Sequence, residues 1–139
     1  MIELIVGLKG KGKTKVILDK VNGSIKEASG NIVYLDKNGK HMYELNNKIR
    51  LIDVSGYPIK NADEFVGFIC GIISQDHDLE AIYLDSFLPI SKLEGKDVTD
   101  TLEQLKAIGS SFNIKFVISM SLDKADVPAS LQDCIIEAL

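Results

Sequence analysis

The residues best suited to chemistry lie near the start of the chain, where glycine, lysine and threonine recur at fixed spacing. The segment follows the pattern G-x-x-x-x-G-K-[ST], and its residues are Gly7, Leu8, Lys9, Gly10, Lys11, Gly12, Lys13 and Thr14. Glycines allow backbone turns that other residues disfavour, so successive N–H groups can point at the oxygens of one phosphate. A following helix would present its unpaired N–H groups and partial positive charge to the same anion. The pattern therefore predicts a phosphate-binding loop.

The side chains of this segment suit a nucleoside triphosphate. Lys13 is expected to reach the terminal phosphates and take part in catalysis, and the Thr14 hydroxyl is expected to coordinate Mg²⁺. Lys9, Lys11 and Lys15 add positive potential around the loop. We therefore expect residues 7–15 to bind the nucleotide, and we expect this nucleotide to be ATP.

A second acidic position completes the predicted metal site. Asp85 follows the apolar run Ala81–Leu84 and would stand at the carboxyl end of a buried strand. A carboxylate in this place holds magnesium or its water in many phosphate-loop proteins. Thr14 and Asp85 are thus the expected Mg²⁺ ligands, with a capping role as the structural alternative for Asp85.

With the phosphate loop and Leu84-Asp85-Ser86, the chain resembles the RecA-like branch of P-loop ATPases. In that branch the acid that activates water comes at the end of the second strand, in a pattern like Tyr-Ile-Asp-x-Glu-Gly. Here Asn38 stands in the place of that glutamate, within the segment 34–39. An amide orients water but takes its proton poorly, and Ser86 supplies no base either. Asp36 is the nearby substitute, so Asp36 and Asn38 are both candidate catalytic residues.

The resemblance implies an ATPase whose hydrolysis is weak or depends on a partner. RecA-like proteins often act as oligomers with nucleotide between subunits, so a homo-oligomer or a protein partner could supply missing groups. Arg50 is the only arginine, and its place at the start of a strand disfavours an arginine finger from within the chain. The chain is also similar to a short family of bacterial P-loop proteins of uncharacterised function.

Two alternative functions remain open at the level of sequence. Asp53–Gly56 fits D-x-x-G, and Asp123–Asp126 resembles N-K-x-D with aspartate in the first position, so a small GTP-binding protein is one alternative. The other is a non-catalytic, nucleotide-gated interaction module. Its candidate contact surface is the apolar segment Phe87–Lys96, which could equally pack on its own core.

Composition limits the remaining classes of function. The chain has 139 residues and a net charge of −4, which gives no support to a general nucleic-acid-binding role. Cys70 and Cys134 lie far apart in apolar surroundings and are expected to be buried free thiols, and His41 and His77 are too isolated to suggest a metal site. No run of about 18 apolar residues is present. We expect a cytoplasmic protein that is not anchored in a membrane.

The elements that must position these residues alternate along the chain. Apolar runs predict five strands, at 2–6, 31–36, 50–54, 80–85 and 114–120, and patterns of helical spacing follow the glycine loop, Asn61, Asp97 and Pro128. Asn38-Gly39 favours a tight turn, after which 41–45 would return as an extra antiparallel strand. The fold class expected for residues 1–139 is α/β, a single domain with a three-layer P-loop NTPase-like fold and a mainly parallel five-stranded sheet.

Overall fold

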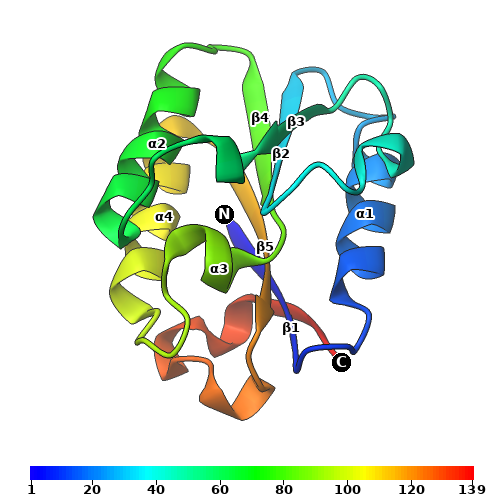
Figure 1. Ribbon diagram of the computed structural model, residues 1–139. Helices are drawn as coiled ribbons and strands as arrows, with labels where there is room; N and C mark the ends of the chain where they lie inside the picture. The colour runs from blue at the N-terminus through cyan, green and yellow to red at the C-terminus, as the bar shows by residue number, and fades with distance from the viewer.

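The computed structural model describes all residues, 1–139, and is built on a parallel sheet of six strands (Figure 1). The strands stand in the order β3-β2-β4-β5-β1-β6, and every neighbouring pair is parallel. Their bounds are β1 Ile2–Gly7, β2 Asn31–Asp36, β3 Arg50–Asp53, β4 Leu79–Leu84, β5 Lys115–Ser121 and β6 Ile135–Ala138. The α/β class and the mainly parallel sheet expected from the sequence are therefore confirmed.

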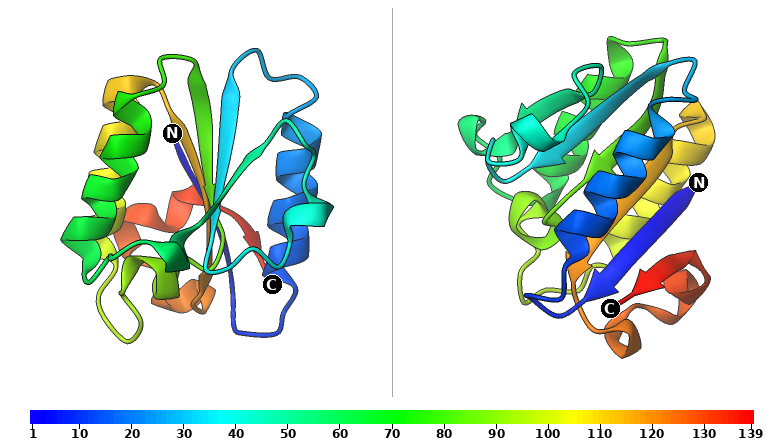
Figure 2. Two further views of the ribbon diagram at one scale, coloured as in Figure 1. Left: turned by 45° about the horizontal axis from the view of Figure 1, so that its top comes forward. Right: turned by 90° about the vertical axis from the view of Figure 1, so that its right-hand side faces the viewer.

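Helices cover both faces of the sheet and make three layers (Figure 2). Helix α1 (Lys13–Ser24) packs alone on one face, where its buried residues meet Tyr34, Tyr83 and Val117 of the strands. Helices α2 (Ala62–Ser74), α3 (Phe87–Ser91) and α4 (Thr99–Phe112) cover the other face and enclose the larger core. No helix has the length and apolar character needed to cross a membrane.

Parallel pairing brings the carboxyl ends of the strands to one edge of the sheet. Strand β5 lies between β1 and β4, with Val6 opposite Met120 and Leu84 opposite Ile118. The glycine-rich segment leaves β1, and Asp85 leaves β4, at this same edge. Crevices at the carboxyl ends of parallel strands are where open α/β sheets bind ligands.

Two expected elements differ from the structure. The segment 41–45 is not an antiparallel strand but contains the 3-10 helix η1 (Met42–Glu44), because the backbone at Asn38 and Gly39 does not adopt the positive φ of a tight hairpin turn. The expected C-terminal helix is instead the 3-10 helix η4 (Ala129–Cys134) followed by β6. Strand β6 pairs with the open edge of β1, which raises the strand number from five to six.

Other expectations about the interior also change. The segment after Asp85 forms α3, and Phe87, Ile90 and Leu93 are buried, so it packs on its own core and is not an apolar contact surface. Cys70 is exposed and Cys134 is partly exposed, so neither is a buried thiol. On α2, which is apolar around much of its circumference, only the face formed by Phe65, Ile69 and Ile73 is fully buried.

The turn before β2 gives a direct test of this packing. A Cβ atom added at Gly30 would lie 2.3 Å from the carbonyl oxygen of Asp78, so the backbone must move to accept it. We expect Gly30→Ala to lower the free energy of unfolding by about 1–3 kcal/mol in urea denaturation. The matched control is Gly67→Ala in α2, where a Cβ meets nothing within 4 Å and alanine should stabilise the helix by about 1 kcal/mol. A Gly30→Ala protein as stable as wild type would contradict the close approach.

Candidate functional site

The glycine-rich segment between β1 and α1 leaves a row of backbone donors without partners. Gly10 and Gly12 adopt φ of 85° and 92°, in the left-handed region that favours glycine. None of the N–H groups from Leu8 to Lys15 donates to a protein acceptor. These donors precede and open a helix of 12 residues, where the backbone already carries partial positive charge. The segment therefore has the free donors that an anion-binding turn requires.

Lys13 is the first residue of α1, and its side chain folds back over the turn. Its ammonium donates to the carbonyl oxygen of Leu8 at 3.0 Å. Burial lowers the pKa of Lys13, while the negative charge of Asp85 acts in the opposite direction. A partly desolvated ammonium beside unpaired N–H groups is a favourable position for a polyanion, whose negative charge would stabilise the charged form of the lysine.

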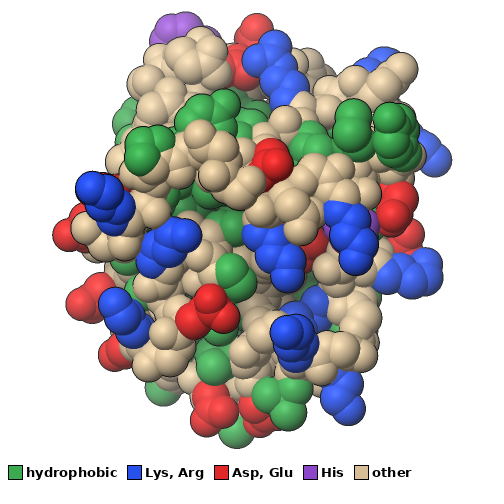
Figure 3. Space-filling view, viewed as in Figure 1, with side chains coloured by type: hydrophobic (Ala, Val, Ile, Leu, Met, Phe, Trp, Pro, Cys, Tyr) green, Lys and Arg blue, Asp and Glu red, His purple; other side chains and the backbone are tan.

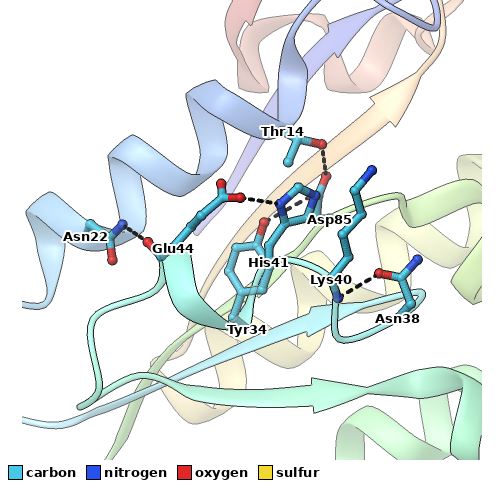
Figure 4. A network of polar contacts seen from close by, with 8 residues as sticks. All are labelled: Thr14, Asn22, Tyr34, Asn38, Lys40, His41, Glu44 and Asp85. Carbon is cyan, nitrogen blue, oxygen red and sulfur yellow. Dashed lines mark hydrogen bonds and ion pairs between the residues drawn. The ribbon is translucent and has the colours of Figure 1, made fainter.

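Asp85 is buried at the carboxyl end of β4 and gathers donors from several elements (Figure 4). One carboxylate oxygen accepts from Ser119 at 2.6 Å, from the Ser86 backbone N–H at 2.9 Å and from the Thr14 hydroxyl at 3.4 Å. The other accepts from the Tyr34 hydroxyl at 3.0 Å. Burial, and then the charge of Asp85, raises the pKa of Tyr34 well above its ordinary value, so this hydroxyl keeps its proton and donates.

The oxygen atoms of Thr14 and Asp85 suit a hard divalent cation. Mg²⁺ prefers oxygen ligands and keeps several waters, with one or two carboxylates and the phosphates of its nucleotide as partners. The structure contains no cluster of three or more His, Cys, Asp or Glu side chains that could hold a metal without help. One carboxylate and one hydroxyl, 3.4 Å apart beside a turn with free N–H donors, fit Mg²⁺ bound together with phosphates. Thr14 and Asp85 would hold the ion, which would neutralise charge on those phosphates.

A cleft of about 500 Å³ opens over these groups. Its lining combines the turn and the start of α1 with the Asp85–Ser119 pair, α3 and the loop at Gly95. Ser86 lines it too and is held in the left-handed region with φ 58°, an uncommon and costly conformation for a residue with a side chain. Basic and acidic side chains are interspersed on this face, with basic ones gathered toward the lower right of Figure 3, where the turn and α1 begin.

Asp36 lies at the end of β2, next in the sheet to the strand that carries Asp85. Its side chain is buried and accepts from the Lys37 backbone N–H at 2.7 Å. Burial, together with the charge of Asp85, raises the pKa of Asp36 from 3.8 to about 6. Asp36 does not line the cleft, so the structure places this candidate base behind the site and not within it.

Asn38, the other candidate in this region, is also outside the cleft. Its side-chain oxygen accepts from the Lys40 backbone N–H at 3.0 Å, so the amide stabilises its own loop. Its neighbour Lys37 does line the cleft, so the loop borders the site while the Asn38 amide does not.

The two motifs of the GTP-binding alternative have different positions. Asp53 ends β3, the edge strand, and is separated from β1 by β2, β4 and β5, a distance of roughly 19 Å at the usual strand spacing. Its side chain caps the 3-10 helix at Val54–Gly56, which explains the D-x-x-G pattern by local structure. Asp123 caps the 3-10 helix Lys124–Asp126 in the same way, but that loop follows β5, directly beside β1.

Sequence reasoning missed two partners of Asp85. Ser119 is the lone hydroxyl among the buried residues of β5, and Tyr34 lies in the middle of β2. A buried polar residue in an otherwise apolar strand needs a hydrogen-bond partner, so Ser119 did carry a signal. Which partner it has depends on strand order, which the sequence pattern does not specify.

Comparison with known proteins shows the fold. No protein-family model matches the chain, and no curated protein matches its sequence. Among solved structures, the chain is similar to the flagellar accessory protein FlaH from Methanocaldococcus jannaschii, with a TM-score of 0.55 and 14% identity. The match covers 95% of this chain and 65% of FlaH, so the chain spans less than two thirds of that protein. The likeness supports the RecA-like fold that the sequence motifs led us to expect. It does not test the similarity to a short family of bacterial P-loop proteins.

The raised pKa of Asp36 predicts how stability depends on pH. Between about pH 4 and pH 6 the folded protein keeps a proton on Asp36 that the unfolded chain has lost, so this group's contribution to stability falls as the pH rises through that window. Asp36→Asn removes the buried charge and still accepts from Lys37. We expect the variant to be stabilised by roughly 1–2 kcal/mol at pH 7.5 and by much less at pH 4.5. Urea unfolding without nucleotide or divalent cations measures this, and equal effects at both pH values would contradict it.

Proposed function

We propose that this chain binds Mg-ATP at the turn formed by residues 7–15. The observation that carries the proposal is the unbroken row of N–H groups without acceptors from Leu8 to Lys15, combined with the partly desolvated ammonium of Lys13. The Thr14–Asp85 pair beside it supplies the oxygen ligands for magnesium. Backbone donors, one lysine and one metal site are the parts that a triphosphate requires.

We further propose that hydrolysis by the isolated chain is slow. Ser86 has no basic side chain, and Asn38 is turned away from the cleft. Arg50 begins β3, at the opposite edge of the sheet from the turn, so it cannot stabilise charge on a transferring phosphate. Turnover is expected to stay below about 1 per second. For faster turnover, a second copy of the chain or another protein would have to supply the arginine that the cleft lacks.

GTP is the second candidate nucleotide, and one observation favours it. The loop that contains Asp126 follows β5, the strand directly beside β1, so it stands at the same edge of the sheet as the turn. A carboxylate in such a loop could accept hydrogen bonds from guanine. Asp53, which belongs to the other GTP-binding motif, D-x-x-G, lies too far from the turn to contact a γ-phosphate there. We therefore favour ATP.

The first test removes the charge at the turn. Lys13→Ala deletes the ammonium expected at the terminal phosphates, and should weaken Mg-ATP binding at least about tenfold in calorimetry, because charge-assisted contacts are worth about 1.5–3 kcal/mol each. The melting temperature should change little, since the lysine makes only one hydrogen bond. The control is Lys48→Ala, an exposed lysine that does not line the cleft. Equal ATP affinity in wild type and Lys13→Ala would refute nucleotide binding at this turn.

The second test separates the nucleotides. Competition with a labelled ATP analogue should show that unlabelled ATP displaces it at least as well as GTP does, and Asp126→Ala should leave both affinities within about twofold. If GTP competes much better, and Asp126→Ala abolishes that preference, the GTP-binding alternative is correct and the assignment to ATP fails.

A further inference from the structure

His41 and Glu44 form a pair on η1 that has no part in the site described so far. The Nδ1 atom of His41 lies 3.2 Å from a carboxylate oxygen of Glu44. The turn that carries them is fastened to α1, since Asn22 donates to the Glu44 carbonyl oxygen at 2.8 Å and accepts from the Asn46 backbone N–H at 2.8 Å. The pair is thereby held against the helix that opens with Lys13 and Thr14.

This pair borders a second cavity, of about 410 Å³, on the α1 side of Thr14. Thr14 lines both this cavity and the nucleotide cleft, so the two meet at the predicted metal ligand. Figure 4 shows His41 and Glu44 in the same close view as Thr14, Tyr34 and Asp85. The charge of His41 also acts on Asp36, at the end of the neighbouring strand, where it opposes the rise in that carboxyl's pKa. The imidazole therefore borders Thr14, the predicted metal ligand, from the side of α1.

The chemistry of the pair is that of an oriented base. When Nδ1 carries the proton and donates it to Glu44, the other ring nitrogen, Nε2, has a free lone pair. A carboxylate that orients an imidazole in this way also stabilises the imidazolium that forms when it takes a proton. Ser86 and Asn38 cannot act as bases, and Asp36 lines neither cavity. Among the residues that line the second cavity with Thr14, Asp19 is paired with Lys15 and Glu44 with His41, so the free lone pair is that of the imidazole.

We propose that His41, oriented by Glu44, accepts the proton of the water that attacks the γ-phosphate of ATP, an inference that rests on the proposed function. In this step the water oxygen forms a bond to the γ-phosphorus, and the bond between that phosphorus and the bridging oxygen breaks. ADP leaves with the electron pair of the broken bond, and the water proton passes to Nε2. The imidazolium then returns the proton to solvent, to which the partly exposed His41 side chain has access.

The step predicts how hydrolysis depends on pH. An imidazole accepts a proton only when it is neutral, so the single-turnover rate should fall when the pH is lowered far enough to protonate the ring. The charged groups around His41 are Glu44 on its own turn, Asp36 on β2, Asp85 beyond β4, and the Lys15–Asp19 ion pair on α1. The ion pair is internally neutral, and Asp36, whose pKa is raised to about 6, is the neighbouring carboxyl that could produce a similar pH dependence. Because the step assigns the pH dependence to His41, Asp36→Asn should keep the pH profile.

Nuclear magnetic resonance can test the placement without activity. The chain has two histidines, so its imidazole spectrum is simple. His77 is exposed in the turn before β4, at the opposite edge of the sheet, and serves as the internal control. Adding Mg²⁺ and a non-hydrolysable ATP analogue to the wild-type protein should shift the His41 signals and leave those of His77 in place. Unmoved His41 signals, with analogue binding established by calorimetry, would overturn the proposal and leave nucleotide binding intact.

Kinetics tests the role itself. His41→Gln should slow single-turnover hydrolysis at least about tenfold and abolish its pH dependence, with Mg-ATP affinity within about threefold of wild type. Glu44→Gln still offers an oxygen to Nδ1, so its rate should fall less, and His77→Gln should match wild type. The proposal fails if His41→Gln retains the wild-type rate and profile, if it loses rate and affinity together, or if wild type binds Mg-ATP without any hydrolysis. Absence of Mg-ATP binding by wild type would instead refute the proposed function.

Discussion

The buried carboxylate of Asp85 is the interaction on which the geometry of the site depends. A charge removed from water is costly unless hydrogen bonds replace its hydration. Here the replacements come from Tyr34 on β2, Ser119 on β5, the Ser86 backbone and Thr14 on α1. Each donor is satisfied only if its own element keeps its place. Three strands and one helix are thereby held around a single pair of oxygen atoms, and that pair lies beside the turn.

The turn shows the opposite balance of polar groups. Its N–H groups have no protein acceptor, and its residues from Leu8 to Gly12 are exposed, so water can solvate these donors at little cost. The turn thus has an excess of donors, whereas both carboxylate oxygens of Asp85 already accept hydrogen bonds from the protein. Two side chains connect the turn with Asp85: the Thr14 hydroxyl, which donates to the carboxylate, and the Lys13 ammonium, which donates to the Leu8 carbonyl oxygen and lies in the field of Asp85. An incoming anion would replace water at the turn without disturbing the donors that hold Asp85.

Sequence patterns predicted the parts of the fold that local physics determines. The apolar runs located β1, β2, β4 and β5, and Asn61 caps α2 as expected, accepting from the Glu64 backbone N–H at 2.9 Å. The hydrogen-bond partners of Asp85 were not predicted because they depend on strand order. The order of the strands brings together residues that are far apart in the sequence, such as Tyr34 and Asp85. The prediction of a C-terminal helix was wrong for a similar reason. A pattern of four apolar residues fits a short helix or a strand, and here the segment pairs with the open edge of β1 and forms the strand β6.

The segment 41–45 shows why one wrong element matters for function. In an extended strand, side chains three residues apart point to opposite faces, and His41 could not meet Glu44. In a 3-10 helix, side chains three residues apart lie over one another, which brings the imidazole to the carboxylate. The same change moves this turn from a hairpin beside β2 to a position against α1, bordering Thr14. The loop that holds the Asn38 amide outside the cleft thus also brings His41 to the cavity on the other side of Thr14.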